Sequence, residues 1–195
     1  KESSAASDVY KRQALAFLIL IQFNSLTVVL GLGSMFLAFS YPFMKRITYW
    51  PQLFLGLTFN WGIIMAWAAI NNNISIGIIT LYISAIFWTL GYDTIYGAQD
   101  IHDDEIIGLK STAIKFKKNI KLFVCFCYIL SFTSLTWLYI EKIGINLFTL
   151  LLLMCLMTLT YQLKIFKKKD PLSCLKAFKI NNFFGLFLFL AIYLI

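Results

Sequence analysis

Charged side chains are scarce in this sequence, and histidine and proline are almost missing. Only 13% of the 195 residues are charged, 60% are apolar, and His102 is the single histidine. A soluble domain of this length cannot cover so much apolar surface with so few charges. The scarcity of charge therefore excludes a water-soluble globular fold.

Cysteine and histidine are also too sparse to build a metal site. Cys125, Cys127, Cys155 and Cys174 lie in or next to apolar runs. Their spacing fits neither a zinc site nor a disulfide framework, so we interpret them as small core residues. His102 has no second histidine or cysteine near it in the sequence, so we expect it on the surface of a loop.

Long uncharged runs dominate the chain instead. Runs of about 18 or more such residues predict membrane spans. Lipid offers the backbone no hydrogen-bond partner, which leaves helices or closed barrels, and the runs lack the alternation of barrel strands. The sequence thus predicts an all-α, polytopic transmembrane helix bundle in the lipid bilayer. The expected spans are residues 26–41, 53–70, 74–92, 120–140, 145–163 and 175–195.

The N-terminal part of the chain differs from the rest. Residues 1–13 are polar and lack the apolar core of a signal peptide, so we interpret them as a tail or a stretch foreign to the natural protein, ahead of a transmembrane domain at 14–195. Residues 14–23 are too short to span and are expected to end a helix. Asn24 and Ser25 predict a turn in which Ser25 caps the next helix.

Two kinds of connection alternate along the chain. Residues 71–73 and 141–144 are tight and nearly uncharged, whereas residues 42–52, 93–119 and 164–174 are longer and basic. Placing the two kinds on opposite faces puts 13 basic residues on one face and only Lys142 on the other. The 13 residues are Lys45, Arg46, Lys110, Lys115, Lys117, Lys118, Lys121, Lys164, Lys167, Lys168, Lys169, Lys176 and Lys179. This bias predicts that the basic face lies on the cytoplasmic side, or on the matrix side in a mitochondrion, and that the net charge of +8 signals topology rather than nucleic-acid binding.

Acidic residues concentrate in the connection after the third expected span. Five of the nine acidic residues of the chain fall within thirteen positions: Asp93, Asp100, Asp103, Asp104 and Glu105. Beside a membrane such a concentration is costly unless a cation binds there. The competing interpretation is a solvated loop whose carboxylates balance nearby lysines.

The spacing selects metal ligands within this loop. Asp100 and Asp104 are four residues apart and share one face of a helix, with Asp93 two turns earlier. Carboxylates together with substrate phosphates are typical Mg²⁺ ligands. Asp103 points about a quarter turn away from Asp104, so we rank it lower. Lys110 follows and is expected to reach phosphate oxygens.

A basic segment ends the first expected span on the same face. It reads YPFMKR, residues 41–46, and Pro42 is expected to mark the helix end. Lys45 and Arg46 are either interface anchors or a clamp on an anion held at the acidic loop. Tyr96 lies inside the acidic segment and is expected to line the site.

These segments resemble a known family. DTIYGAQDIHDDEIIGLKSTAI, residues 93–114, resembles the second aspartate-rich motif of the UbiA family of intramembrane prenyltransferases, and YPFMKR is similar to its basic motif. LGLTFNWGIIMAWAA and KAFKINNFFGLFLFLA resemble its flanking helices in the 4-hydroxybenzoate polyprenyltransferase branch. Several motifs in the right order, from about residue 14 to the end, make the resemblance specific.

The resemblance implies a nine-helix bundle around a cavity, with Mg²⁺ held on a prenyl diphosphate between two aspartate-rich motifs. It assigns Asp100 and Asp104 to the metal and the catalytic step, and Asp93, Tyr96 and Lys110 to the other characteristic positions of the motif. It links Lys45 and Arg46 to the diphosphate or the aromatic acid, and Arg46 is expected to act with Asp100 and Asp104 as a catalytic residue. The family's first motif, NDxxDxxxD, is absent from this sequence, and about six and a half helices can be counted. We therefore expect the C-terminal two-thirds of a longer enzyme.

The resulting hypothesis is Mg²⁺-dependent transfer of a polyprenyl group from polyprenyl diphosphate to the ring of 4-hydroxybenzoate in ubiquinone biosynthesis, in a bacterial or mitochondrial inner membrane. A sibling prenyltransferase with another acceptor is the first alternative. The second is a cation-binding membrane transporter, but ionisable residues are essentially missing between residues 53 and 92 and between 123 and 140. The sequence sets neither the prenyl chain length nor the oligomeric state.

Overall fold

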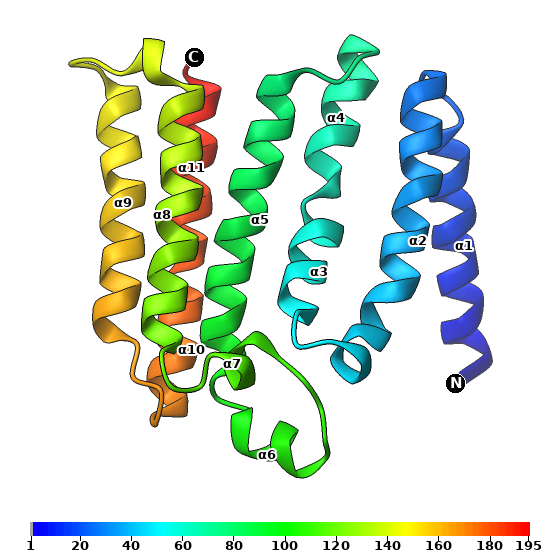
Figure 1. Cartoon of the computed structure of the whole chain (residues 1–195). Coiled ribbons are helices and arrows are strands. Elements are labelled where there is room, and N and C mark those ends of the chain that lie inside the picture. The colour runs from blue at the N-terminus through cyan, green and yellow to red at the C-terminus, as the bar shows by residue number, and fades with distance from the viewer. Residues whose placement is uncertain (1) are drawn as a thin grey trace.

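The computed structural model describes residues 2–195, with side chains from Asp8 onward, and its regular elements are all helical (Figure 1). In chain order these are α1 (Glu2–Leu20), α2 (Ser25–Ile47), α3 (Pro51–Phe59), α4 (Trp61–Asn71), α5 (Ile76–Gly97), α6 (Ile101–Ile106), α7 (Thr112–Lys115), α8 (Ile120–Leu138), the 3₁₀ turn η1 (Ile140–Lys142), α9 (Leu147–Ile165), α10 (Pro171–Lys179) and α11 (Asn181–Tyr193). Six helical segments are long and apolar enough to cross a membrane: α2, α3–α4, α5, α8, α9 and α10–α11. The predicted all-α transmembrane bundle is confirmed.

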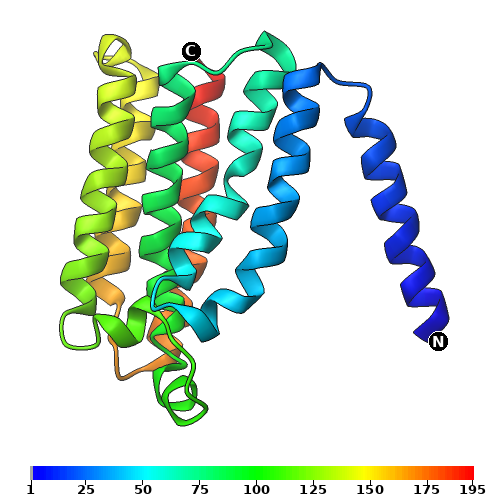
Figure 2. The same cartoon turned by 45° about the vertical axis from the view of Figure 1, so that its right-hand side comes forward.

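Helix α1 stands apart from the rest of the bundle in Figure 2. Its backbone runs without a break from Glu2 through the boundary expected at residue 14 and ends at Leu20, as a short helix end predicts. The interpretation of residues 1–13 as a tail or foreign stretch stays a prediction. The predicted cap of α2 is wrong by one residue: Asn24, not Ser25, is the N-cap, and its Oδ1 accepts the Thr27 N–H at 2.9 Å. The Asn24 amide also donates to the Ala68 carbonyl at 2.7 Å, which ties the start of α2 to α4.

Two spans expected as single helices are broken. The segment 53–70 divides at Asn60 into α3 and α4, and the segment 175–195 divides at Ile180 into α10 and α11. At each break, the side chain of a buried asparagine forms hydrogen bonds with the backbone. The Asn60 amide donates to Gly56 O at 2.9 Å and to Thr89 Oγ1 at 2.8 Å, and the Asn181 amide donates to Phe178 O at 2.8 Å. Side-chain donors and acceptors of this kind make helix breaks tolerable at membrane depth.

Helix α5 is the centre of the bundle and packs against α3, α8 and α10, while α9 packs against α11. Gly91 permits the close approach of α5 to α8, because a Cβ there would lie 2.4 Å from Cε1 of Tyr128. The main core fills the space around this contact with Ile95, Val124 and Leu159. Many large apolar side chains are exposed on the outer faces of the helices, as a bundle in contact with lipid requires.

The two kinds of connection lie at opposite ends of the bundle. The basic segments, with α6, α7 and the start of α10, gather at the lower end of Figure 1, and the short links around α4–α5 and η1 lie at the upper end. The predicted separation of basic and uncharged connections is therefore confirmed. Which end faces the cytoplasm or matrix stays a prediction.

Candidate active site

The basic segment forms the last turns of α2. The helix passes through Pro42 and ends at Ile47, so the predicted helix end at Pro42 is wrong by five residues. Proline costs a helix one backbone hydrogen bond, and here the chain tolerates that loss near its end. Lys45 and Arg46 consequently occupy the final turn, where their positive charges oppose the negative end of the helix dipole. Both side chains are exposed at the end of the bundle that carries the acidic residues.

The acidic segment is divided among three local structures. Asp93 and Tyr96 lie in the last turns of α5, Asp100 precedes α6, and Asp104 lies in the first turn of α6. The expectation of one continuous helix from Asp93 to Asp104 is wrong, because α5 ends at Gly97 and the chain turns before α6 begins. Asp100 and Asp104 are still one helical turn apart, as their spacing predicts, since the Asp104 N–H donates to the Asp100 carbonyl at 2.9 Å.

Gly108 closes α6 and fixes the turn behind Asp104. Its φ of +74° lies in the left-handed region that favours glycine. The Leu109 N–H donates to the Asp104 carbonyl at 2.8 Å and the Gly108 N–H donates to the Glu105 carbonyl at 3.3 Å. These two bonds form a Schellman cap. Gly108 itself was the sequence signal for this cap, because glycine is the residue most often found just after the end of a helix.

The five acidic side chains fall into two groups. Glu105 forms a salt bridge with Lys117 at 2.6 Å, and Asp103 lies 3.4 Å from the exposed His102 ring. Among the side chains that the structure describes, the carboxylates of Asp93, Asp100 and Asp104 take part in no salt bridge and no side-chain hydrogen bond. The three residues predicted as metal ligands are thus the three without a protein partner. His102 lies on the loop surface, as expected.

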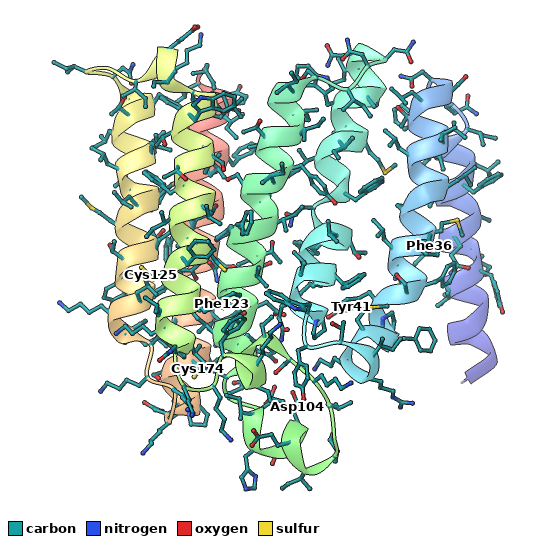
Figure 3. The ribbon with its side chains drawn as sticks, in the orientation of Figure 1. Phe36, Tyr41, Asp104, Phe123, Cys125 and Cys174 are labelled. Carbon is teal, nitrogen blue, oxygen red and sulfur yellow. The ribbon has the colours of Figure 1, made fainter. Side chains whose placement is uncertain are left out.

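The unpaired carboxylates lie in a charged environment. Burial raises the pKa of Asp100, the charges of Asp104 and Asp103 raise it further, and Lys45 opposes them. Lys45 also acts electrostatically on Asp93, so the charge of one lysine of α2 influences two of the three carboxylates. Asp104 is only 7% exposed. Figure 3 shows Asp104 in the α6 segment below α5, at the same end of the bundle as Tyr41 on α2.

This donor set fits a hard divalent cation. Carboxylates that repel one another and lack protein partners gain most from such a cation, and Mg²⁺ takes oxygen ligands of this kind. Among the side chains that the structure describes, residues 8–195, no group of three or more His, Cys, Asp or Glu is placed so that it could hold a metal ion by itself. One or two carboxylates completed by substrate phosphates and water would be the usual magnesium arrangement. Asp100 and Asp104, whose charges act on each other, are the residues that could supply them.

A hydrogen-bond clamp, buried at Gln52 and exposed at the Lys110 ammonium, joins the acidic segment to α2 and α3. The Gln52 side chain, 4% exposed, accepts the Thr112 N–H at 2.9 Å. The Lys110 N–H donates to the Lys45 carbonyl at 2.8 Å, and its ammonium donates to the Ile47 carbonyl at 3.1 Å. Lys110 was predicted to reach phosphate, which stays a prediction, and in this structure it links the acidic segment to α2. Gln52 was missed, because a single glutamine after a proline carries no pattern of its own.

An aromatic row leads from the acidic end into the bundle. Tyr96 and Tyr92 contact the Phe178 ring with centroids 4.8 and 5.7 Å apart, and Trp88 lies 5.2 Å from Tyr92 and 4.6 Å from Phe184. Tyr96 is partly exposed, and it forms the outer end of the row. Trp88 and Phe184 also line an apolar hollow of about 250 Å³ between α5, α8 and α11.

The cysteines of the described chain form no disulfide and no metal site. All four cysteines are free; Cys127, Cys155 and Cys174 are buried and Cys125 is partly buried, which confirms their prediction as core residues.

The comparison with family models decides the membership of the chain. Residues 13–190 match the model described as the UbiA prenyltransferase family. The chain belongs to the UbiA prenyltransferase family. The sequence resemblance is thereby confirmed, and the aspartate-rich and basic segments lie in a UbiA fold.

Curated relatives of this chain within the UbiA family are named as 4-hydroxybenzoate prenyltransferases. The chain is 40% identical over 180 residues to the 4-hydroxybenzoate octaprenyltransferase of Psychromonas ingrahamii, covering 92% of the chain and 62% of that protein. It is 38% identical over 185 residues to the mitochondrial 4-hydroxybenzoate polyprenyltransferase of Drosophila melanogaster, covering 93% of the chain and 46% of that protein. The chain therefore spans about half the length of these relatives. With six apolar spans, it is an integral membrane protein.

Solved structures support the UbiA fold independently. The apo structure of a UbiA homologue from Aeropyrum pernix K1 matches with a TM-score of 0.80 at 20% identity, covering all of this chain and 73% of that one. A digeranylgeranylglyceryl phosphate synthase structure matches with a TM-score of 0.69 at 17% identity, covering 96% of this chain and 68% of that one. At these identities the likeness concerns the fold alone.

Proposed function

We propose that the protein to which this chain belongs transfers a polyprenyl group from polyprenyl diphosphate to the ring of 4-hydroxybenzoate, in ubiquinone biosynthesis. The observation that carries the proposal is the pair of carboxylates Asp100 and Asp104, which have no described protein partner and lie at the same end of the bundle as the basic end of α2. The substrates come from the names of the relatives, because the geometry by itself specifies only an anion and a cation.

Asp100 and Asp104 would hold Mg²⁺, with Asp93 as the third nearby carboxylate. The metal would neutralise the negative charge that develops on the departing diphosphate. Lys45 and Arg46 supply fixed positive charge at the same place, and such preorganised charge is worth most where water is excluded. Lys110 holds the acidic segment against α2, so that the carboxylates and the basic residues keep their relative positions.

The transfer breaks the bond between the allylic carbon and the diphosphate oxygen, and the electron pair leaves with the diphosphate. The ring carbon next to the phenolic hydroxyl forms the new carbon–carbon bond and then loses its proton. Water would quench the allylic cation, and the apolar interior beneath Tyr96 excludes it. The ring faces of the aromatic row from Tyr96 to Trp88 would stabilise the allylic cation by cation–π attraction.

The full-length protein, reconstituted in lipid, tests this assignment through Asp100→Asn and Asp104→Asn. Each substitution removes a metal ligand while keeping the side-chain size, and we expect Mg²⁺-dependent prenyl transfer to fall by at least about 100-fold. Asp103→Asn is the matched control in the same loop and should retain activity within a factor of about three, since its carboxylate faces an exposed histidine. Near-normal transfer in both test variants would exclude the site.

The acceptor and the membrane side are tested separately. Assays with 4-hydroxybenzoate and other aromatic acceptors should favour 4-hydroxybenzoate, and a preference for another acceptor would indicate a sibling enzyme. The proposed cytoplasmic or matrix location of the basic end predicts that a cysteine at His102 reacts with an impermeant thiol reagent only from that side. A cysteine at Gly144, at the opposite end, should react only from the other side.

A further inference from the structure

A second basic site lies outside the proposed active site, at the start of α8. A hollow of about 350 Å³ opens there between α8 and the α9–α10 connection. Lys118, Lys121 and Lys168 form its polar wall, and the buried Ile120 and Phe166 form its apolar floor. We call it the lysine hollow. The metal-binding carboxylates do not line it, so its charge has a different purpose from that of Lys45 and Arg46.

The charge of the lysine hollow is of one sign. The three lysine side chains are exposed, and none of the residues described as lining the hollow is acidic. None of the three forms a salt bridge among the side chains that the structure describes. Lys168 is held across the hollow, because its ammonium donates to the Lys117 carbonyl at 2.6 Å. Three cations gathered around one concavity attract an anion with several oxygen acceptors.

The start of α8 adds donors to the same concavity. Asn119 is the N-cap of this 19-residue helix and makes no side-chain capping bond. The first backbone N–H groups of α8, at Ile120 and Lys121, accordingly have no protein acceptor among the described hydrogen bonds. These donors supplement the lysine charges, which remain the main attraction for an anion.

An apolar stripe extends from the lysine hollow along the outside of α8. Leu122, Phe126 and Ile129 are 71%, 56% and 55% exposed, and their spacing places them on one face of the helix. Leu122 also lines the hollow, so the charged and apolar surfaces are continuous. A free phosphate would use only the lysines, whereas a phospholipid would use both surfaces.

We infer that the lysine hollow binds the phosphodiester headgroup of an anionic phospholipid, with an acyl chain lying along Leu122, Phe126 and Ile129. Basic pockets at the end of a membrane span are suited to such headgroups. This lipid is distinct from the prenyl substrate, and its binding does not depend on the proposed prenyl transfer.

Native mass spectrometry of the full-length protein tests this inference with phosphatidylglycerol as the probe. Lys118→Gln, Lys121→Gln and Lys168→Gln combined should lower the affinity for the lipid by at least about tenfold. The matched control is Lys164→Gln, Lys167→Gln and Lys169→Gln, which removes the same charge from the same end of the bundle outside the hollow. The control should lose less than about threefold. Equal losses in both triple variants would overturn the inference, since binding would then reflect diffuse charge.

Further measurements distinguish a phospholipid from a free phosphate ion as the ligand. Inorganic phosphate should compete weakly with phosphatidylglycerol, and complete competition at millimolar phosphate would identify a free-anion site instead. Leu122→Asn should weaken lipid binding without changing phosphate binding. The triple Lys→Arg variant keeps the charge and should retain the lipid, which separates loss of binding from loss of folding. Because lipid binding is measured directly, its failure would leave the proposed transfer activity untouched.

Discussion

The two ends of the helix bundle are built in different ways. At the uncharged end, Ser75 caps α5 and Asn146 caps α9 by accepting backbone N–H groups three residues later, and only Asn24 adds a bond to a distant residue, Ala68, among the described side chains. At the basic end, hydrogen bonds join residues about sixty positions apart, from Thr112 to Gln52 and from Lys110 to Ile47. Local caps only end and begin helices. Long-range bonds also fix one segment relative to another, which a site assembled from two segments requires.

The charges follow the same division. Lys142 lies at the uncharged end, in η1, and is far from any cluster of carboxylates. Lys45 lies at the basic end and acts on both Asp93 and Asp100. The difference between the ends can therefore be tested with pairs of matched substitutions, one at the basic end and one at the uncharged end.

The largest expected effect is on prenyl transfer by the full-length protein. Lys45→Met should lower kcat/KM by about 10- to 100-fold, because it removes fixed positive charge facing the developing diphosphate. Lys142→Met should leave kcat/KM within about twofold, since that lysine contacts no site residue. Steady-state kinetics with polyprenyl diphosphate and 4-hydroxybenzoate measure both. If the two variants behaved alike, Lys45 would be an interface anchor rather than part of the site.

The next effect concerns the clamp at Gln52. Gln52→Leu leaves the buried Thr112 N–H without its acceptor and should lower the free energy of unfolding by about 1–3 kcal/mol. Gln22→Leu is the matched change at the other end, where the glutamine is exposed and makes no side-chain hydrogen bond among the described residues, so it should cost under about 0.5 kcal/mol. Unfolding followed by circular dichroism in detergent gives both values. Equal losses would show that the clamp adds no specific stability.

Gly108 at the basic end and Gly144 at the uncharged end provide another matched pair of substitutions. Gly108→Ala places a side chain at φ +74° and should destabilise the protein by about 1–2 kcal/mol, with a shift of Asp104 that weakens Mg²⁺ binding. Gly144→Ala, at the uncharged end, adds a Cβ whose nearest neighbour is 3.6 Å away and should cost under about 0.5 kcal/mol. Thermal unfolding with and without Mg²⁺ measures both effects. A larger loss for Gly144→Ala would contradict the cap assigned to Gly108.

Patterns spread over many residues were predictable from the sequence. Apolar run length predicted the spans, and the one-sided distribution of lysine predicted which connections share an end of the bundle. The grouping of acidic residues predicted where a cation site would lie, and the four-residue spacing selected Asp100 and Asp104. Each of these predictions rests on a pattern of several residues, so it does not depend on any single tertiary contact.

Features that depend on one tertiary contact were not predictable. The break at Asn60 exists because Thr89 on α5 accepts its amide, and nothing near Asn60 in the sequence encodes that partner. The continuation of α2 beyond Pro42 is a similar case, because proline alone favours an end there. Gln52 and Thr112 lie sixty positions apart, and only the folded chain brings them together.

The smallest expected effect distinguishes buried from exposed links at the basic end. Lys117→Gln removes the salt bridge to Glu105, whose two side chains are 45% and 38% exposed, and should cost only about 0.2–1 kcal/mol. The loss should shrink further at about 1 M salt, where exposed charges are screened. Unfolding measured at low and high salt, with Lys142→Gln as the control at the uncharged end, provides the comparison. The basic end keeps its geometry mainly through buried amide hydrogen bonds, so Lys117→Gln must cost less than Gln52→Leu; the reverse order would assign that geometry to surface charge instead.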